Sequence, residues 1–117
     1  MSGVKDYGYC QIYLRGGTRQ AVTELIEAVL DAQVDDHWTF RAGRLLFETR
    51  RNPDAGLAAD FIGWPIKIEA ETDDPDPVLV DAVSQVLRTA WDHGYDAVAA
   101  CDFEDELPDL GGLPRYR

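Results

Sequence analysis

The chain has 117 residues, 45% of them hydrophobic, and its 22 acidic and 11 basic residues give a formal net charge of −11. This length and apolar content are typical of one globular domain, which buries its core without a metal or a disulfide. The negative charge repels the phosphates of nucleic acids and of anionic lipids, so we expect no direct nucleic-acid binding and no membrane binding.

Alternating aromatic and β-branched residues predict a strand over residues 7–14. One face of this strand carries Cys10, Ile12 and Leu14. The opposite face carries Tyr7, Tyr9 and Tyr13. Gly16-Gly17 ends the strand, and Thr18 is a favourable N-cap for a helix over residues 19–32, where apolar side chains recur at the spacing of one helix face.

The middle of the chain predicts further β structure. Residues 37–41 and 44–51 predict either one long strand bent at a bulge or a tight hairpin, with Ala42-Gly43 between them. One side of the second segment carries Arg44, Leu46 and Glu48. Residues 61–71 predict a strand with an edge or bulge at Pro65, because proline lacks a ladder donor. The predicted core face of that strand carries Ile62, Trp64, Ile66, Ile68 and Ala70.

A second helix is predicted from residues 73–77 to a stop at Gly94, and residues 95–101 predict a short last strand. The apolar stripe of this helix consists of Leu79, Val83, Val86, Leu87 and Ala90. The order β-α-β-β-α-β predicts an α+β fold of the ferredoxin-like type, a two-layer sandwich in which two helices cover one face of an antiparallel sheet. We expect a single domain over residues 1–117, whose C-terminal segment, 103–117, is acidic and then Pro/Gly-rich.

The N-terminal residues lack the apolar run of a signal peptide, and no stretch approaches the roughly 18 apolar residues of a membrane span, so we expect a cytoplasmic location. Cys10 and Cys101 are then expected to be reduced thiols. The predicted topology makes the first and last strands neighbours, which allows the two cysteines to face each other across the ladder. We interpret them as buried, inert thiols.

Little in the sequence predicts catalysis. His37 and His93 are the two histidines of the chain. His93 lies where the C-terminus of a helix favours its charge, and His37 has no second metal ligand at a recognisable spacing. The glycines before Thr18 lack the lysine of a phosphate-binding loop. We therefore expect no enzymatic activity, no catalytic residue, no cofactor and no metal site.

Acidic side chains are concentrated in two stretches of the second half of the chain. The first stretch contains Glu69, Glu71, Asp73, Asp74 and Asp76. The second contains Asp102, Glu104, Asp105, Glu106 and Asp109. One leads into the second helix and the other follows the last strand, so we expect both at the same end of the sheet, as a docking surface for a basic protein partner. The alternative is a solvated charged rim that keeps the protein soluble.

Tyr7, Tyr9 and Tyr13 form a second candidate surface on the sheet face opposite the helices, with Trp38 and Phe40 beside them. Aromatic side chains on an uncovered sheet are typical of binding surfaces. Such a face would serve a protein partner, a small-molecule-binding or enzymatic domain, or a homodimer. Alternatively, a loop, the C-terminal segment or a second subunit covers it.

Residues 61–71 (FIGWPIKIEAE) and 98–108 (VAACDFEDELP), with the helix between them, resemble small uncharacterised bacterial proteins. Small acidic domains of this kind resemble immunity proteins, which block a toxin by masking its basic site. The resemblance rests on no short motif, so it assigns no site residue. It implies a non-enzymatic inhibitor whose partner is a basic protein such as a toxin.

Overall fold

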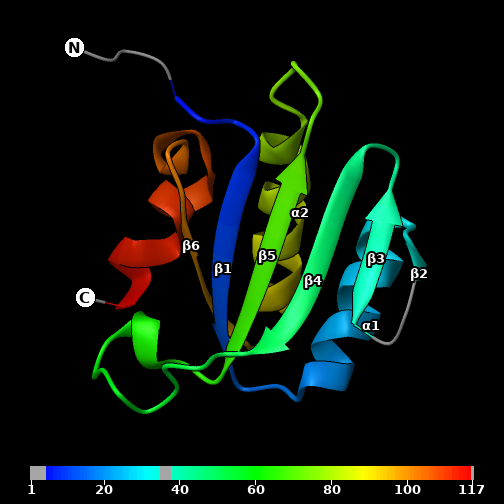
Figure 1. Ribbon diagram of the computed structural model, residues 1–117. Helices are drawn as coiled ribbons and strands as arrows, with labels where there is room; N and C mark the ends of the chain where they lie inside the picture. The colour runs from blue at the N-terminus through cyan, green and yellow to red at the C-terminus, as the bar shows by residue number, and fades with distance from the viewer. Residues whose placement is uncertain (1–4, 35–37, 117) are drawn as a thin grey trace.

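The computed structural model describes residues 5–34 and 38–116. Its strands are β1 (Tyr9–Arg15), β2 (Gln33–Val34), β3 (Thr39–Ala42), β4 (Leu45–Arg51), β5 (Ile66–Thr72) and β6 (Asp96–Ala100). Within the described residues, these six strands form one antiparallel sheet in the order β2-β3-β4-β5-β1-β6. The helices α1 (Arg19–Leu30) and α2 (Val78–Asp92) both lie behind the sheet (Figure 1). The predicted α+β class is therefore confirmed.

The sheet is larger than the four-stranded ferredoxin-like sandwich, so that predicted order is not matched. β2 and β3 add two short strands outside β4. Residues 39–51 form the tight-hairpin alternative: Ala42 pairs with Leu45, and Gly43 turns the chain with a φ of 62°, which glycine adopts without steric cost. β2 has only two residues, too few for an alternating pattern of apolar and polar side chains to predict it as a strand. The start of the strand predicted at His37 lies outside the described residues.

Helix α1 begins at the predicted cap. The Thr18 hydroxyl accepts a hydrogen bond from the backbone N–H of Ala21, which satisfies one of the free donors of the first turn. The helix ends two residues earlier than predicted because Asp31 adopts a left-handed conformation, with a φ of 52°. Its buried side chains face the inner side of the sheet and include Val22 and Ile26.

The main core fills the space between the sheet and the two helices. Cys10, Ile12 and Leu14 of β1 are all buried there, as their alternation predicts. The predicted stripe of α2 is buried as well: Leu79, Val83, Val86, Leu87 and Ala90. Phe40 and Phe47 stack across the β3–β4 pair with ring centroids 5.7 Å apart. Among the described residues, no helix combines the length and the apolar character needed to cross a bilayer.

The strand predicted over residues 61–71 begins only at Ile66, and this corrects the predicted face of Trp64. Asp60 caps a short 3-10 helix, η1 (Phe61–Gly63), by accepting from the N–H of Ile62. The buried Asn52 amide donates to the carbonyl oxygens of Ile62 and Trp64, at 2.6 and 2.7 Å. These carbonyls are therefore held away from the sheet ladder. Ile62 lies 42% exposed, and Trp64 packs on the sheet face opposite the helices.

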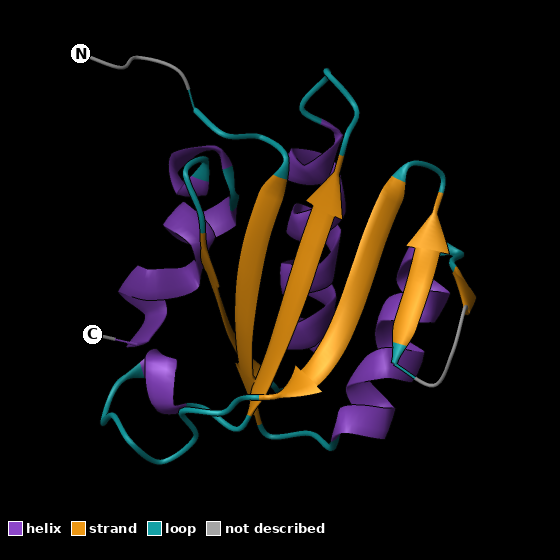
Figure 2. Cartoon of the chain, in the orientation of Figure 1, coloured by secondary structure: helices purple, strands orange, loops and turns teal. Residues whose placement is uncertain are grey.

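The C-terminal segment forms 3-10 turns, η2 (Glu104–Glu106) and η3 (Pro108–Tyr116), beside β6 (Figure 2). The acidic and then Pro/Gly-rich segment is thus partly helical. Ala97, on the outer side of β6, donates its N–H to the Tyr116 hydroxyl at 3.0 Å and accepts from the Trp91 indole at 3.1 Å. Tyr116 of the C-terminal segment and Trp91 of α2 therefore satisfy backbone groups of an edge strand that would otherwise be open to pairing.

Candidate binding surface

The two acidic stretches lie at the same end of the sheet. β5 and β6 flank β1 and both run antiparallel to it, so both end where β1 begins (Figure 1). Strands separated by one neighbour are about 10 Å apart, which brings the two stretches close together. We call this group the acidic end; it comprises Glu71, Asp73, Asp74, Asp76, Asp102, Glu104, Asp105 and Glu106. Glu69 lies two residues earlier, on the strand itself.

The N-terminal segment before β1 crosses the acidic end and binds part of it. The Lys5 ammonium donates to Asp105 at 2.7 Å and to Glu106 at 3.1 Å. The backbone N–H of Asp6 donates to the Asp102 carboxylate at 2.9 Å. Because three of its carboxylates already bind residues 5 and 6, the second acidic stretch is only partly available to a partner.

Tyr7 lies on the core side of the sheet, which corrects its predicted place beside Tyr9 and Tyr13. Its ring stacks on Phe103, with centroids 5.6 Å apart, and packs against the main core. Its hydroxyl donates to Glu106. The bend at Gly8, before β1 begins, breaks the alternation on which the prediction relied.

These contacts shift the pKa values of the groups that make them. Hydrogen bonds from Tyr7 and from Lys5 lower the pKa of Glu106, and the hydrogen bond from Lys5 lowers that of Asp105. The same hydrogen bonds raise the pKa of Lys5 and of Tyr7. Both carboxylates are therefore ionised near neutral pH and hold the N-terminal segment in place.

We expect Tyr7→Phe to raise the pKa of Glu106 toward 4.5, the ordinary value for a glutamate. The folded-state pKa lies below the unfolded one, so the contact contributes stability above the unfolded pKa and loses it as the pH falls through the folded pKa. Carboxyl chemical shifts followed by NMR during an acid titration measure this value. Tyr9→Phe, on the other face of the sheet, is the control and leaves Glu106 unchanged. An unchanged Glu106 in Tyr7→Phe would contradict the contact.

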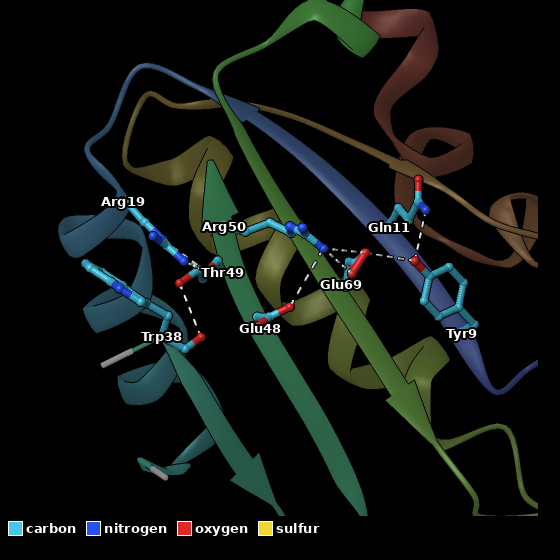
Figure 3. Close-up of polar contacts among 8 residues, drawn as sticks. All are labelled: Tyr9, Gln11, Arg19, Trp38, Glu48, Thr49, Arg50 and Glu69. Atoms are coloured by element: carbon cyan, nitrogen blue, oxygen red, sulfur yellow. Dashed lines mark hydrogen bonds and ion pairs between the residues drawn. The ribbon is translucent and has the colours of Figure 1, made fainter. Parts of the chain in front are cut away.

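The open face of the sheet carries a polar network across β1, β5 and β4 (Figure 3). The Gln11 amide donates to the Tyr9 hydroxyl at 2.9 Å, and that hydroxyl donates to Glu69 at 3.3 Å. Glu48 and Glu69 are direct cross-strand partners, a pairing of like charges that destabilises a sheet. Arg50 offsets this repulsion, because its guanidinium lies 3.1 Å from Glu69 and 3.9 Å from Glu48.

Beside this network, the open face is hollowed. A depression of about 230 Å³ is lined by Tyr9, Thr39, Leu46, Glu48, Glu69 and Glu71. A second, of about 410 Å³, shares Leu46 and Glu71 with the first and is also lined by Arg41, Arg44, Thr72 and Asp73. No described residue donates a hydrogen bond to the Glu71 carboxylate. The open face therefore joins the acidic end through Glu71.

The predicted aromatic surface is divided between different parts of the molecule. Tyr9 remains partly exposed on the open face, whereas Tyr13 is buried by a second cluster that includes Trp64 and Val98. Tyr116 of the C-terminal segment packs edge-on against Trp64, with centroids 5.0 Å apart. One part of the open face is thus covered, in part by the C-terminal segment, which was the stated alternative for the tyrosines.

Trp38 and Phe40 do not lie beside these tyrosines. Phe40 is fully buried in the main core. Trp38 stacks on the Arg19 guanidinium, 4.0 Å from its ring centroid, and Arg19 donates to the carbonyl oxygen of Thr49 at 2.6 Å (Figure 3). These contacts hold the first turn of α1 against the β3–β4 side of the sheet.

The predicted structural role of His93 agrees with its position. It follows α2, and its Nδ1 lies 2.9 Å from the carbonyl oxygen of Thr89. His37 lies outside the described residues. In the part of the chain that the structure describes, no three His, Cys, Asp or Glu side chains converge as metal ligands.

Sequence reasoning did not connect Glu48, Arg50 and Gln11 to the acidic residues of β5. Alternation separates Leu46 and Glu48 from the core face, but only the register of β4 with β5 places Glu48 opposite Glu69. No protein-family model, curated protein or solved structure matches this chain.

Proposed function

We propose that this domain is a non-enzymatic interaction module that binds a basic protein through its acidic end and the adjoining open face. The convergence of the two acidic stretches where β5 and β6 end carries the proposal. A partner with a basic active site, as in a toxin, would be masked by such a surface in the manner of an immunity protein. The proposal includes a cytoplasmic site of action, for which the two free cysteines are suited.

The open depression suits a basic side chain of the partner. Its rim carries the carboxylates of Glu48, Glu69 and Glu71. A lysine or arginine placed there meets a charged acceptor and lies near the Tyr9 ring, whose face attracts cations. Because Arg50 already pairs with Glu48 and Glu69, Glu71 is the carboxylate most available to the partner.

The first acidic stretch is the better target for mutation. Asp105 and Glu106 hold Lys5, so reversing their charge would also release the N-terminal segment. Glu71, Asp73 and Asp76 are exposed. Among the described residues, Asp73 pairs with Arg44 alone, whose side chain is itself exposed, so its loss has little effect on the fold.

We expect the triple variant Glu71→Lys, Asp73→Lys, Asp76→Lys to lose the basic partner. The matched control is Glu24→Lys, Asp81→Lys, Asp92→Lys, which changes the net charge equally on the outer faces of α1 and α2, where all three acids are exposed. Immobilised wild-type and variant domains are compared by affinity capture from the native host with quantitative mass spectrometry. Basic proteins retained by wild type and control but lost from the first variant support the proposal.

Binding kinetics with the captured partner complete the test. Charges at the rim of an interface act mainly on association, so the first variant should lower the association rate about tenfold or more, and added salt should lower the wild-type rate steeply. The control should change this rate by less than about twofold. Equal losses in both triple variants would show that net charge alone matters and would overturn the acidic end as the docking surface.

A small cationic ligand in the depression is the second candidate, because three carboxylates line it. The two candidates differ in how far the site extends. A small ligand depends on Glu71 and not on Asp76, whereas a protein partner depends on both. Single Glu71→Gln and Asp76→Asn variants therefore separate them.

A further inference from the structure

The two cysteines face each other at the edge of the main core. In the register of β1 and β6, Gln11 pairs with Ala100, so one further step places Cys10 opposite Cys101. Directly opposed residues of antiparallel strands have Cα atoms about 4.5–5.5 Å apart, within the roughly 4.4–6.8 Å that a disulfide spans. Both side chains lie on the helix side, where they pack against the same cluster. The opposed arrangement that the topology allowed is therefore present.

We propose that Cys101 is an oxidation site that forms a reversible disulfide with Cys10 when the protein meets a peroxide. The two thiols differ in access: Cys10 is fully buried, whereas Cys101 is partly exposed at the end of β6. An oxidant therefore reaches Cys101 first, and Cys10 is held in place to react with the product. This inference is independent of the proposed binding function.

The surroundings give the two sulfurs different chemical roles. The hydrogen bond from Cys10 lowers the pKa of Cys101, and a hydrogen bond from the backbone of Phe103 lowers it further, while burial and the charges of Glu104 and Asp102 oppose them. The same interaction with Cys101, together with burial, raises the pKa of Cys10. Cys101 therefore loses its proton more readily than Cys10, and the thiolate is the form that reacts with a peroxide.

The reaction proceeds in two steps. The Cys101 thiolate attacks one oxygen of hydrogen peroxide; an S–O bond forms, the O–O bond breaks, and hydroxide leaves and is protonated to water. The sulfur of Cys10 then attacks the sulfenic acid on Cys101; an S–S bond forms, the S–O bond breaks, and the Cys10 proton leaves with the hydroxyl as water. Two thiols and one peroxide yield one disulfide and two waters.

The test treats the wild-type protein with hydrogen peroxide and measures its intact mass and its reaction with iodoacetamide. We expect the loss of two hydrogens, no reaction with iodoacetamide, and full reversal by dithiothreitol. The midpoint of thermal unfolding should rise by about 5 °C or more, because the bond closes a long loop of the unfolded chain. A wild-type protein that instead keeps both thiols, or that gains oxygen at Cys101 without the disulfide, would overturn the proposal.

Two serine variants assign the roles. Cys10→Ser should accumulate the sulfenic acid of Cys101, which dimedone traps, because the second thiol is missing. Cys101→Ser should leave Cys10 unreacted under the same treatment, because no exposed thiol remains. Circular dichroism confirms that each variant is folded, and the wild-type measurement decides the matter if either is not. A Cys10 that reacts as fast as Cys101 would contradict the order of the steps.

Discussion

Replacing Trp64 by alanine is expected to lower the free energy of unfolding by about 3–5 kcal/mol, measured by denaturant titration. The side chain is 6% exposed and packs with Tyr13 and Val98. Its ring also contacts Tyr116 edge-on and lies 4.7 Å from the Arg15 guanidinium. The variant therefore removes the centre of the second cluster and leaves a cavity that these neighbours fill only in part.

Ile62→Ala is the matched control for this prediction. Ile62 belonged to the same predicted core face, but it lies in η1 and is 42% exposed. Its truncation should cost less than about 1 kcal/mol, in the range of substitutions away from a core. Comparable losses in the two variants would return both residues to one face of a continuous strand and contradict the break before Ile66.

Gly112→Ala is expected to destabilise the fold by about 2–4 kcal/mol in the same measurement. Gly112 has a φ of 97°, a conformation that is strained for residues with a Cβ. A Cβ there would lie 2.6 Å from the carbonyl oxygen of Ala97 and 2.7 Å from Cζ2 of Trp91, so η3 would be pushed away from β6. Limited proteolysis should then cleave the C-terminal segment more rapidly.

Gly94→Ala separates the cost of the backbone conformation from the cost of the steric clash. Gly94 has a similar φ of 82°, but nothing lies within 4 Å of the position of its Cβ. This variant carries the conformational cost alone, about 1–2 kcal/mol, with no change in proteolysis of the C-terminal segment. If the two glycine variants lost the same free energy of unfolding, the close packing of η3 on β6 would not contribute to the stability of the fold.

The sequence predicted the position of the candidate binding surface but not the side-chain contacts within it. The direction of β5 and β6 follows from the order of elements, so the meeting of the two acidic stretches at one end was predictable. The binding of Lys5 by Asp105 and Glu106 was not, because it joins residues about a hundred positions apart through side chains alone. The carboxylates that remain available, Glu71 foremost, are therefore known only from the structure.

Local patterns in the sequence determined β1 with its two faces, the cap of α1, and the buried stripe of α2. Each of these features depends on residues within a few positions of one another, so alternation, helical spacing or a capping residue predicts it directly. The tertiary structure decided the rest. Asn52 withdraws the carbonyls of Ile62 and Trp64 from the ladder, and the Tyr116 hydroxyl occupies the edge of β6. Such bonds connect distant segments whose approach no local pattern encodes, because it is set by how the whole sheet packs against its helices and its C-terminal segment.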